Sequence, residues 1–301
     1  SLTDTTIEKN LNLNANNTRV TGGSANGITV ASGTDGNSIS GTQTSQVDDN
    51  SGNAEIDVQP PAGAVVNAGT GASYDTIQAA VDDAGTDATI RIGAGTYEES
   101  ATIDKEGLTL EAAEGATPTI SAPTSDRDTI TASANGVTVQ GLTVEATGGS
   151  TPRGIVLNAG NTAAINNDVS HADSVSDKSR TGPLIAVAGG DSVTVDGNTV
   201  TDGPIAYTGG TDNQVAFTNN TIEGDLVDES FFAFGGTNPD ITFTGNDFSA
   251  ADAGQDADVK FDLGSVMVND ETDDATIATS VIGNNTGVDG VQGTDGQTRT
   301  E

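Results

Sequence analysis

Residues Ser73–Glu99 read SYDTIQAAVDDAGTDATIRIGAGTYEE, and here a helical pattern passes directly into a strand pattern. Apolar residues recur at i, i+3, i+4 and i+7, as in an amphipathic helix: Ile77, Ala80, Val81 and Ala84. Ser73 or Asp75 is the expected N-cap, and Gly85 is the expected stop. Isoleucines then alternate with polar residues before a glycine-rich bend. The stretch predicts one short helix at residues 73–84 that leads into a long series of strands.

One phrase recurs downstream: an alternating strand, a Gly or Asn, one further residue, and a second apolar strand. The copies are VTVQGLTV from Val137, VTVDGNTV from Val193, VAFTNNTI from Val215 and ITFTGNDF from Ile241, with a weaker copy, TAAINNDV, from Thr162. Aligned on Leu142, Asn167, Asn198, Asn220 and Asn246, they are separated by 25, 31, 22 and 26 residues. Such spacings are typical of single turns of a wide parallel solenoid. They predict an all-β chain wound as a parallel β-helix.

The repeated asparagine has two interpretations. It would be a polar stripe that binds sugar, or a structural residue of a tight turn. We favour the second interpretation, in which each asparagine adopts the left-handed αL conformation and stacks on the asparagine of the next turn.

The helix-to-strand stretch resembles the opening of right-handed parallel β-helices of the pectin lyase-like superfamily, and GTYEE at Gly95–Glu99 resembles the opening motif of pectin methylesterases. The resemblance implies a right-handed parallel β-helix (solenoid) with a short amphipathic capping α-helix. It also implies polysaccharide cleavage or ester hydrolysis, the commonest activities of the superfamily. An esterase needs an aspartate that opens a D-F-I-F-G-like strand, and FFAFGG has Phe231 in that place. The resemblance therefore transfers the fold and not the activity.

Other catalytic arrangements are equally incomplete. A lyase-like site would need an acidic calcium cluster beside an arginine or lysine base, for which Arg153 and Arg180 are the candidates. Arg180 lies in the polar insertion HADSVSDKSRTG at 171–182, whose nearest acids are Asp173 and Asp177. The alternative interpretation of this insertion is a solvated loop. His171, in the same insertion, is the only histidine of the chain and has no histidine partner for a metal or catalytic pair. We expect no catalytic residues.

Residues 1–58 also look like turns of a β-helix, although they precede the predicted capping helix. SANGITV at 24–30 nearly repeats SANGVTV at 133–139. PPAG and a Gly/Ala run then interrupt the strand pattern. We predict an N-terminal block at residues 1–58, a linker at 59–72, and a β-helix at 73–301 with its capping helix at 73–84. After Phe248 the pattern loosens, with a strand expected around Ile277–Ile282 and no C-terminal lid.

The composition limits the partners of the protein. The 301 residues include 44 acidic and 10 basic residues, for a net charge of −34, which disfavours nucleic acid and anionic membranes. This excess of acid indicates adaptation to molar salt, the alternative being an ordinary acidic secreted protein. No cysteine is present and no apolar run approaches a membrane span. With no leader-like segment at Ser1, we interpret the chain as a mature exported protein or an excised fragment.

Small-ligand sites are few. We expect no cofactor, although the turn around Asp35 and Asn37 is a candidate for weak binding of calcium or another cation. Three N-x-T sequons are candidates for glycosylation of an exported protein: Asn16, Asn219 and Asn284.

These observations favour a structural, extracellular or cell-surface protein that joins its copies head to tail into a filament or surface layer. Residues of the N-terminal block are the predicted assembly residues: Ile7, Leu11, Leu13, Val20, Ile28, Val30, Ile56 and Val58. One alternative is a polysaccharide-binding module or a pectin-type enzyme. A second alternative is a viral spike or fibre, which would form trimers.

Overall fold

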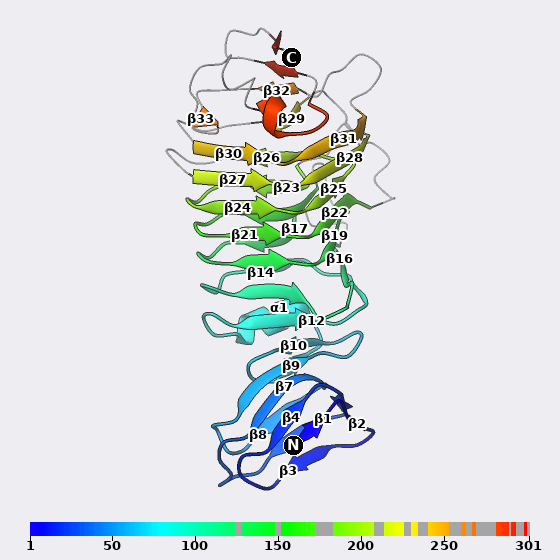
Figure 1. Ribbon diagram of the computed structural model, residues 1–301, viewed down its shortest axis with the longest axis vertical. Helices are drawn as coiled ribbons and strands as arrows, with labels where there is room; N and C mark the ends of the chain where they lie inside the picture. The colour runs from blue at the N-terminus through cyan, green and yellow to red at the C-terminus, as the bar shows by residue number, and fades with distance from the viewer. Residues whose placement is uncertain are drawn as a thin grey trace. The chain divides into compact units, whose positions relative to one another are not determined.

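The structure is a computed structural model, shown in Figure 1, that describes residues 1–123, 128–147, 152–172, 183–207, 214–225, 230–233, 240–252, 260–262, 267–268, 281–288, 290–292 and 298–299. The chain forms two compact units. Unit 1 comprises Ser1–Tyr97 and Gly107–Thr119, and unit 2 comprises Glu98–Glu106 and Ile120–Glu301. Short β-strands dominate both units, and most of them pair in parallel, so the chain is all-β as predicted.

Unit 1 contains one α-helix, α1 (Ile77–Asp83), and a series of short strands. The strands are β1 (Leu2–Thr3), β2 (Thr6–Ile7), β3 (Leu11–Leu13), β4 (Arg19–Thr21), β5 (Ser24–Ala25), β6 (Ile28–Val30), β7 (Ser38–Gln43), β8 (Val47–Asp49), β9 (Glu55–Gln59), β10 (Val65–Asn67), β11 (Ser73–Tyr74), β12 (Thr89–Ile92), β13 (Thr96–Tyr97) and β15 (Thr109–Ala112). The strand β16 (Thr119–Ser121) spans the boundary to unit 2.

The strands of the first 58 residues pair in parallel with one another and form a stack. We call each repeat of this stack a rung. Leu2 pairs with Val20, Val20 with Ile39, and Ile39 with Ile56, so equivalent residues follow at steps of 18, 19 and 17. A second column joins Leu11, Ile28 and Val47. Apolar residues at equivalent positions therefore pack directly on one another and form the core.

The N-terminal block packs in cis on the rest of unit 1. The backbone N–H of Val47 donates to the carbonyl of Gly71 at 2.9 Å, and Val66 shares the hydrophobic core of the block. Gly71 has a φ of +71°, and a Cβ there would lie 2.5 Å from the Cβ of Val47, so glycine permits this approach. Residues 59–72, which we predicted as a linker, contain β10, whose pairing with β11 and β12 is antiparallel.

The helix is shorter than predicted. Ser73 lies in β11, where its backbone is committed to the pairing with β10, so the N-cap is neither Ser73 nor Asp75. Thr76 takes that role, because its hydroxyl accepts the backbone N–H of Ala79 at 3.1 Å. The predicted apolar stripe is confirmed by the burial of Ile77, Ala80 and Val81, which pack towards β10, β11 and β12.

The described residues of unit 2 form three parallel sheets, a smaller sheet and a helical segment at residues 281–284. The strands, in chain order, are β14 (Ala101–Ile103), β17 (Asp128–Ala132), β18 (Thr138–Gln140), β19 (Thr143–Ala146), β20 (Arg153–Leu157), β21 (Ala163–Ile165), β22 (Asp168–His171), β23 (Ile185–Val187), β24 (Val193–Asp196), β25 (Thr199–Thr201), β26 (Ile205–Tyr207), β27 (Gln214–Thr218), β28 (Thr221–Asp225), β29 (Ser230–Ala233), β30 (Asp240–Thr244), β31 (Asp247–Asp252), β32 (Lys260–Asp262), β33 (Met267–Val268), β34 (Gly290–Gln292) and β35 (Thr298–Arg299).

The three parallel sheets of unit 2 run in the orders β18-β21-β24-β27-β30-β33, β19-β22-β25-β28-β31 and β14-β17-β20-β23-β26. Figure 1 shows β21, β24, β27 and β30 as successive parallel arrows. The register places like residues together, as in the column Ile130, Ile155, Ile185 and Ile205. The repeat read from the sequence is therefore the spacing of paired strands.

The repeated asparagines form a buried ladder, as predicted. Oδ1 of each asparagine accepts the backbone N–H of its counterpart in the previous rung, from Leu142 through Asn167, Asn198, Asn220 and Asn246 to Asn285. The prediction of an αL conformation for these asparagines is wrong, because the positive φ belongs to the residue before each of them: Gly141, Asn166, Gly197, Asn219 and Gly245. The turn residue and the ladder residue are thus separate neighbours.

The prediction of a strand around Ile277–Ile282 is also wrong for residues 281 and 282, which the structure describes. Residues 281–284 are helical, and the Asn285 side chain donates to the carbonyl of Val281 at 2.8 Å. Residues 277–280 lie outside the described residues. None of the helices in the described ranges has the length and apolar character to cross a bilayer.

Candidate functional site

The predicted assembly residues belong to the core of the N-terminal block. Five are buried, namely Leu13, Val20, Ile28, Val30 and Val58, and three are partly buried, namely Ile7, Leu11 and Ile56. Burial in cis therefore accounts for most of the set. The apolar side chains that keep some exposure in the first rung, formed by β1, β2 and β3, are Leu2, Ile7 and Leu11.

The first rung leaves its strands with one neighbour each. Among the described residues, β1 pairs only with β4, β2 with β5, and β3 with β6. Beneath these strands lies a narrow gap, too small to admit water, that is lined by Leu2, Thr5, Ile7, Leu11, Val20, Gly22, Ser24, Ala25 and Thr42. We call the outer edge of β1, β2 and β3, with the side chains of Leu2, Ile7 and Leu11, the first-rung edge. It combines unpaired strand edges with accessible apolar side chains, a combination that favours pairing with another chain.

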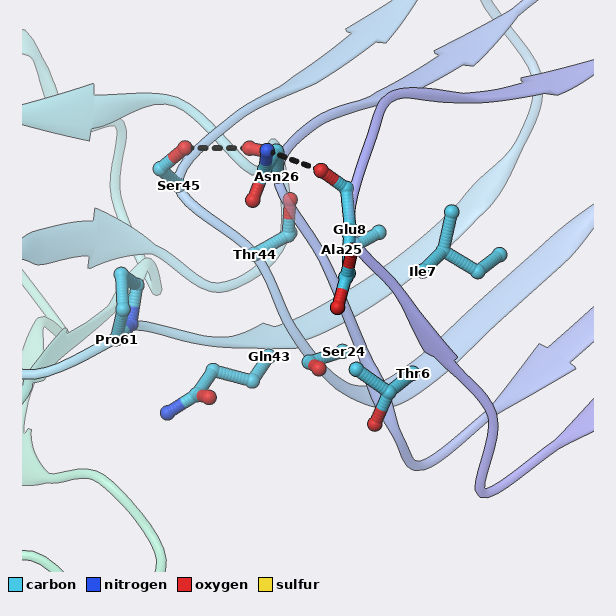
Figure 2. A pocket seen from close by; sticks show the side chains of 10 residues that line it. All are labelled: Thr6, Ile7, Glu8, Ser24, Ala25, Asn26, Gln43, Thr44, Ser45 and Pro61. Atoms are coloured by element: carbon cyan, nitrogen blue, oxygen red, sulfur yellow. Dashed lines mark hydrogen bonds between the residues drawn. The ribbon is translucent and has the colours of Figure 1, made fainter.

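A groove lies beside this edge, within unit 1 (Figure 2). It has a volume of about 310 Å³ and is lined by Thr6, Ile7, Glu8, Ser24, Ala25, Asn26, Gln43, Thr44, Ser45 and Pro61. Nine of these ten residues are three consecutive positions repeated on three rungs. Thr6 pairs with Ser24 and Ser24 with Gln43, so the groove crosses the strands of β2, β5 and β7.

Glu8, Asn26 and Ser45 form one bank of the groove, and hydrogen bonds between rungs join them, as the dashed lines in Figure 2 show. Asn26 donates its side-chain N–H to the carbonyl of Glu8 at 2.8 Å, and Ser45 donates its hydroxyl to the carbonyl of Asn26 at 2.6 Å. Thr6, Ser24 and Gln43 form the other bank, where the Gln43 side chain donates to the carbonyl of Pro60 at 3.4 Å. Backbone bonds from Ser24 to Thr5 and from Gln43 to Gly23 hold the strands beneath.

Several polar groups of the groove remain available. The hydroxyls of Thr6 and Ser24 and the carboxylate of Glu8 take part in no side-chain hydrogen bond within the described part of the chain. Glu8 is the one ionisable residue in the lining. The groove therefore offers hydroxyls, amides and a single negative charge. Sequence reasoning missed it, because residues 18 or 19 positions apart give no local signal.

An ion cluster that sequence reasoning also missed joins the two parts of unit 1. Arg91 of β12 bonds Glu111 of β15 at 2.7 Å, contacts the carboxylate of Asp57, and donates to the carbonyl of Val58 at 3.0 Å. Burial acts to lower the pKa of Arg91, but the hydrogen bonds and charges of Glu111 and Asp57 outweigh it and raise the pKa. The guanidinium thus stays charged and ties β9 to β12 and β15.

The candidate cation turn is occupied by its own hydrogen bonds. Asn37 is buried, its Oδ1 accepts the N–H of Thr18 at 2.8 Å, and its Nδ2 donates to Thr34 at 2.9 Å. Asp35 accepts from Asn53 at 3.0 Å and from Gly36 at 2.9 Å. Across the described ranges, no group of three or more His, Cys, Asp or Glu is placed to hold a metal ion. Cation binding at this turn stays a prediction.

All three sequon asparagines lie on the surface. Asn16, Asn219 and Asn284 are exposed. Asn16 accepts the N–H of Asp35 at 2.9 Å, and Asn219 donates to Asp196 at 2.9 Å. A glycan on either side chain would have to coexist with that bond or replace it.

The residues weighed for catalysis do not form a site in the described residues. Arg153 is engaged by both carboxylate oxygens of Asp128 in the neighbouring rung, each at 2.6 Å. His171 is not a loop residue but the last residue of β22, and it is buried. Phe231 lies in β29, and its side chain is outside the described ones. Arg180, Asp173 and Asp177 fall on residues outside the described ranges.

One acidic residue of unit 2 has a shifted protonation equilibrium. Partial burial, together with the charge of Glu223, raises the pKa of Asp168 in β22. Its side chain is nevertheless exposed to solvent in part. The raised pKa of Asp168 therefore reflects burial first and repulsion from Glu223 second.

Comparison with known proteins adds no assignment: no protein-family model, no curated protein and no solved structure matches the chain.

Proposed function

We propose that the chain is a right-handed parallel β-helix of the pectin lyase-like kind that acts as a structural, surface-exposed protein, its copies joining head to tail in molar salt. In-register parallel columns in both units support the solenoid, since each column repeats the same residue class from rung to rung. The acidic composition supports adaptation to salt. Export and glycosylation at the exposed sequons belong to the same proposal.

The first-rung edge is the observation that carries the assembly. The N-terminal block already packs in cis through Val47, Val58 and Val66, so a further partner would meet its other side, at β1, β2 and β3. Leu2, Ile7 and Leu11 would gain full burial there. Unpaired parallel edges accept added strands, and such an addition supplies backbone hydrogen bonds as well as apolar contact.

The complementary surface of the second copy lies in unit 2. The strand β33 is the last member of its sheet among the described residues, whereas β31 is followed by Thr286, which bridges to Asp247 in parallel. A contact between the first rung of one copy and the last rungs of another is heterologous. A heterologous contact that does not close into a ring generates filaments.

The test measures the size of the full chain in molar salt by sedimentation velocity and negative-stain microscopy. We expect elongated particles that lengthen with concentration. Leu11→Asp places a charge on the first-rung edge, whereas Asn12→Asp places the same charge on the exposed side of the same strand. Leu11→Asp should abolish elongation, and Asn12→Asp should preserve it.

A bulky domain fused ahead of Ser1 provides a second test that leaves the core intact, and it should also block elongation. The proposal fails if the wild-type chain stays monomeric or forms closed trimers at every concentration. It also fails if the fused protein, or Leu11→Asp with an unchanged circular dichroism spectrum, still elongates. The non-catalytic role fails if pectin-like substrates release methanol or unsaturated products.

A further inference from the structure

The groove on the N-terminal block has the properties of a ligand site that is distinct from the first-rung edge, although the two share β2 and the side chain of Ile7. Its volume of about 310 Å³ falls within the range of roughly 300–1,000 Å³ found for small-molecule sites. Its two banks carry polar side chains, and Ile7, Ala25 and Pro61 add apolar surface (Figure 2). A lining that mixes convergent polar groups with apolar walls is typical of small-molecule sites.

The charge of the lining narrows the ligand class. The chain carries 44 acidic residues, yet Glu8 is the single ionisable group among the ten that line the groove. No arginine or lysine lines the groove, so an anionic ligand would meet the charge of Glu8 at close range without a compensating cation. Sulfated, phosphorylated or uronic acid ligands are therefore disfavoured.

The available hydrogen-bonding groups match a polyol. The hydroxyls of Thr6 and Ser24 can each donate and accept, while the carboxylate of Glu8 accepts only. A sugar hydroxyl also both donates and accepts. A sugar hydroxyl can therefore donate to Glu8 on one bank, or bond the hydroxyls of Thr6 and Ser24 on the other, without any change in the protonation of these side chains.

The direction of the groove favours a glycan over an extended peptide. The groove crosses successive strands, so Thr6, Ser24 and Gln43 repeat at the strand spacing of about 4.8 Å. The side chains on one face of an extended peptide repeat at about 6.6–6.8 Å and would fall out of step with these residues. Linked sugar rings present hydroxyl groups on every ring.

We propose that this groove binds a neutral oligosaccharide of about two or three hexose units, laid along the stack from Thr6 towards Pro61. Thr6 and Ser24 bond ring hydroxyls from one bank, and Glu8 accepts hydroxyl bonds from the other. The bonds from the Asn26 side chain to the backbone carbonyl of Glu8 and from the Ser45 hydroxyl to that of Asn26 fix the backbone of this bank before the ligand arrives. A preformed bank lowers the entropic cost of binding. The proposal does not depend on head-to-tail assembly.

The experiment uses the full chain in molar salt with three neutral trisaccharides, cellotriose, maltotriose and mannotriose, and with trigalacturonate as the acidic comparison. Binding is followed by methyl-resolved NMR titration. At least one neutral trisaccharide should shift the methyl signals of Ile7, Ala25 and Thr6 with saturation, and trigalacturonate should not. Shifts confined to other methyl groups, or no saturable shift with any neutral trisaccharide, would overturn the proposal.

Two variants locate the site. The pair Thr6→Val and Ser24→Ala removes both hydroxyls with little change in shape, and should weaken binding by about tenfold or more. Thr21→Val is the matched control, because Thr21 is an exposed residue of β4 that does not line the groove. Equal affinities for the double variant and Thr21→Val would overturn the proposal. Elongation should be the same in both variants, so a failure here is separate from a failure of assembly.

Discussion

Asn198 donates both its backbone N–H and its side-chain N–H to Oδ1 of Asn220 in the next rung, each at 3.0 Å. The same side chain donates to the carbonyl of Ala164 at 2.9 Å. Its own Oδ1 accepts two bonds from Asn167. With 1% of its surface exposed, Asn198 is buried, and these bonds satisfy its polar groups. One amide thus joins three rungs.

Replacing that amide should be costly. Asn198→Ala leaves both donors of Asn167 and the carbonyl of Ala164 without their partner, and we expect a loss of about 2–4 kcal/mol in the free energy of unfolding. Thr242→Ala, at an exposed position of β30, is the control and should change it by less than about 0.5 kcal/mol. Denaturant unfolding in molar salt measures both. Equal losses would show that the ladder contributes little.

The ion cluster of Arg91 predicts a local effect. Arg91→Met should destabilise unit 1 by about 1–2 kcal/mol, a modest value because Asp57 is half exposed and its attraction is screened. Hydrogen exchange of the backbone around β9 should accelerate, since Val58 and Asp57 lose their contact with β12. Arg19→Met, at an exposed position of β4, is the control. Unchanged exchange at β9 in Arg91→Met would contradict this role.

The raised pKa of Asp168 predicts a dependence of stability on pH. Because its pKa is higher in the folded state, protonation of Asp168 favours folding. This contribution is fully present below the unfolded pKa and is lost as pH rises through the folded value. Asp168→Asn should therefore raise the melting temperature at pH 7, and the gain should fade as pH falls towards 4. Thermal unfolding across this range measures the difference, and a gain that persists at low pH would contradict the assignment.

The net charge of −34 predicts a dependence on salt. The screening length grows from roughly 3 Å at 1 M to roughly 30 Å at 0.01 M, so repulsion between carboxylates grows on dilution. The melting temperature should fall accordingly. Scanning calorimetry from molar to millimolar sodium chloride provides the measurement. A constant melting temperature would remove the argument for adaptation to salt.

Local pattern was enough to predict several features. The spacing of the copies from Val137 to Ile241 predicted the paired strands and the ladder, because a stack repeats the same short phrase in each rung. The apolar stripe of α1 followed in the same way from helical periodicity. The amount of strand and the parallel pairing were thus readable from the sequence by itself.

The groove, the cluster of Arg91 and the cis packing of residues 1–58 were decided by tertiary structure. Glu8, Asn26 and Ser45 meet only because two intervening turns have particular lengths, and Arg91 lies 34 residues from Asp57. Asn285 joins the ladder after a step of 39 residues, outside the range of the other steps. Such contacts depend on the number of residues in each turn, which hydrophobic periodicity does not encode. Periodicity determines which face of a strand is buried, whereas turn length determines which strands meet.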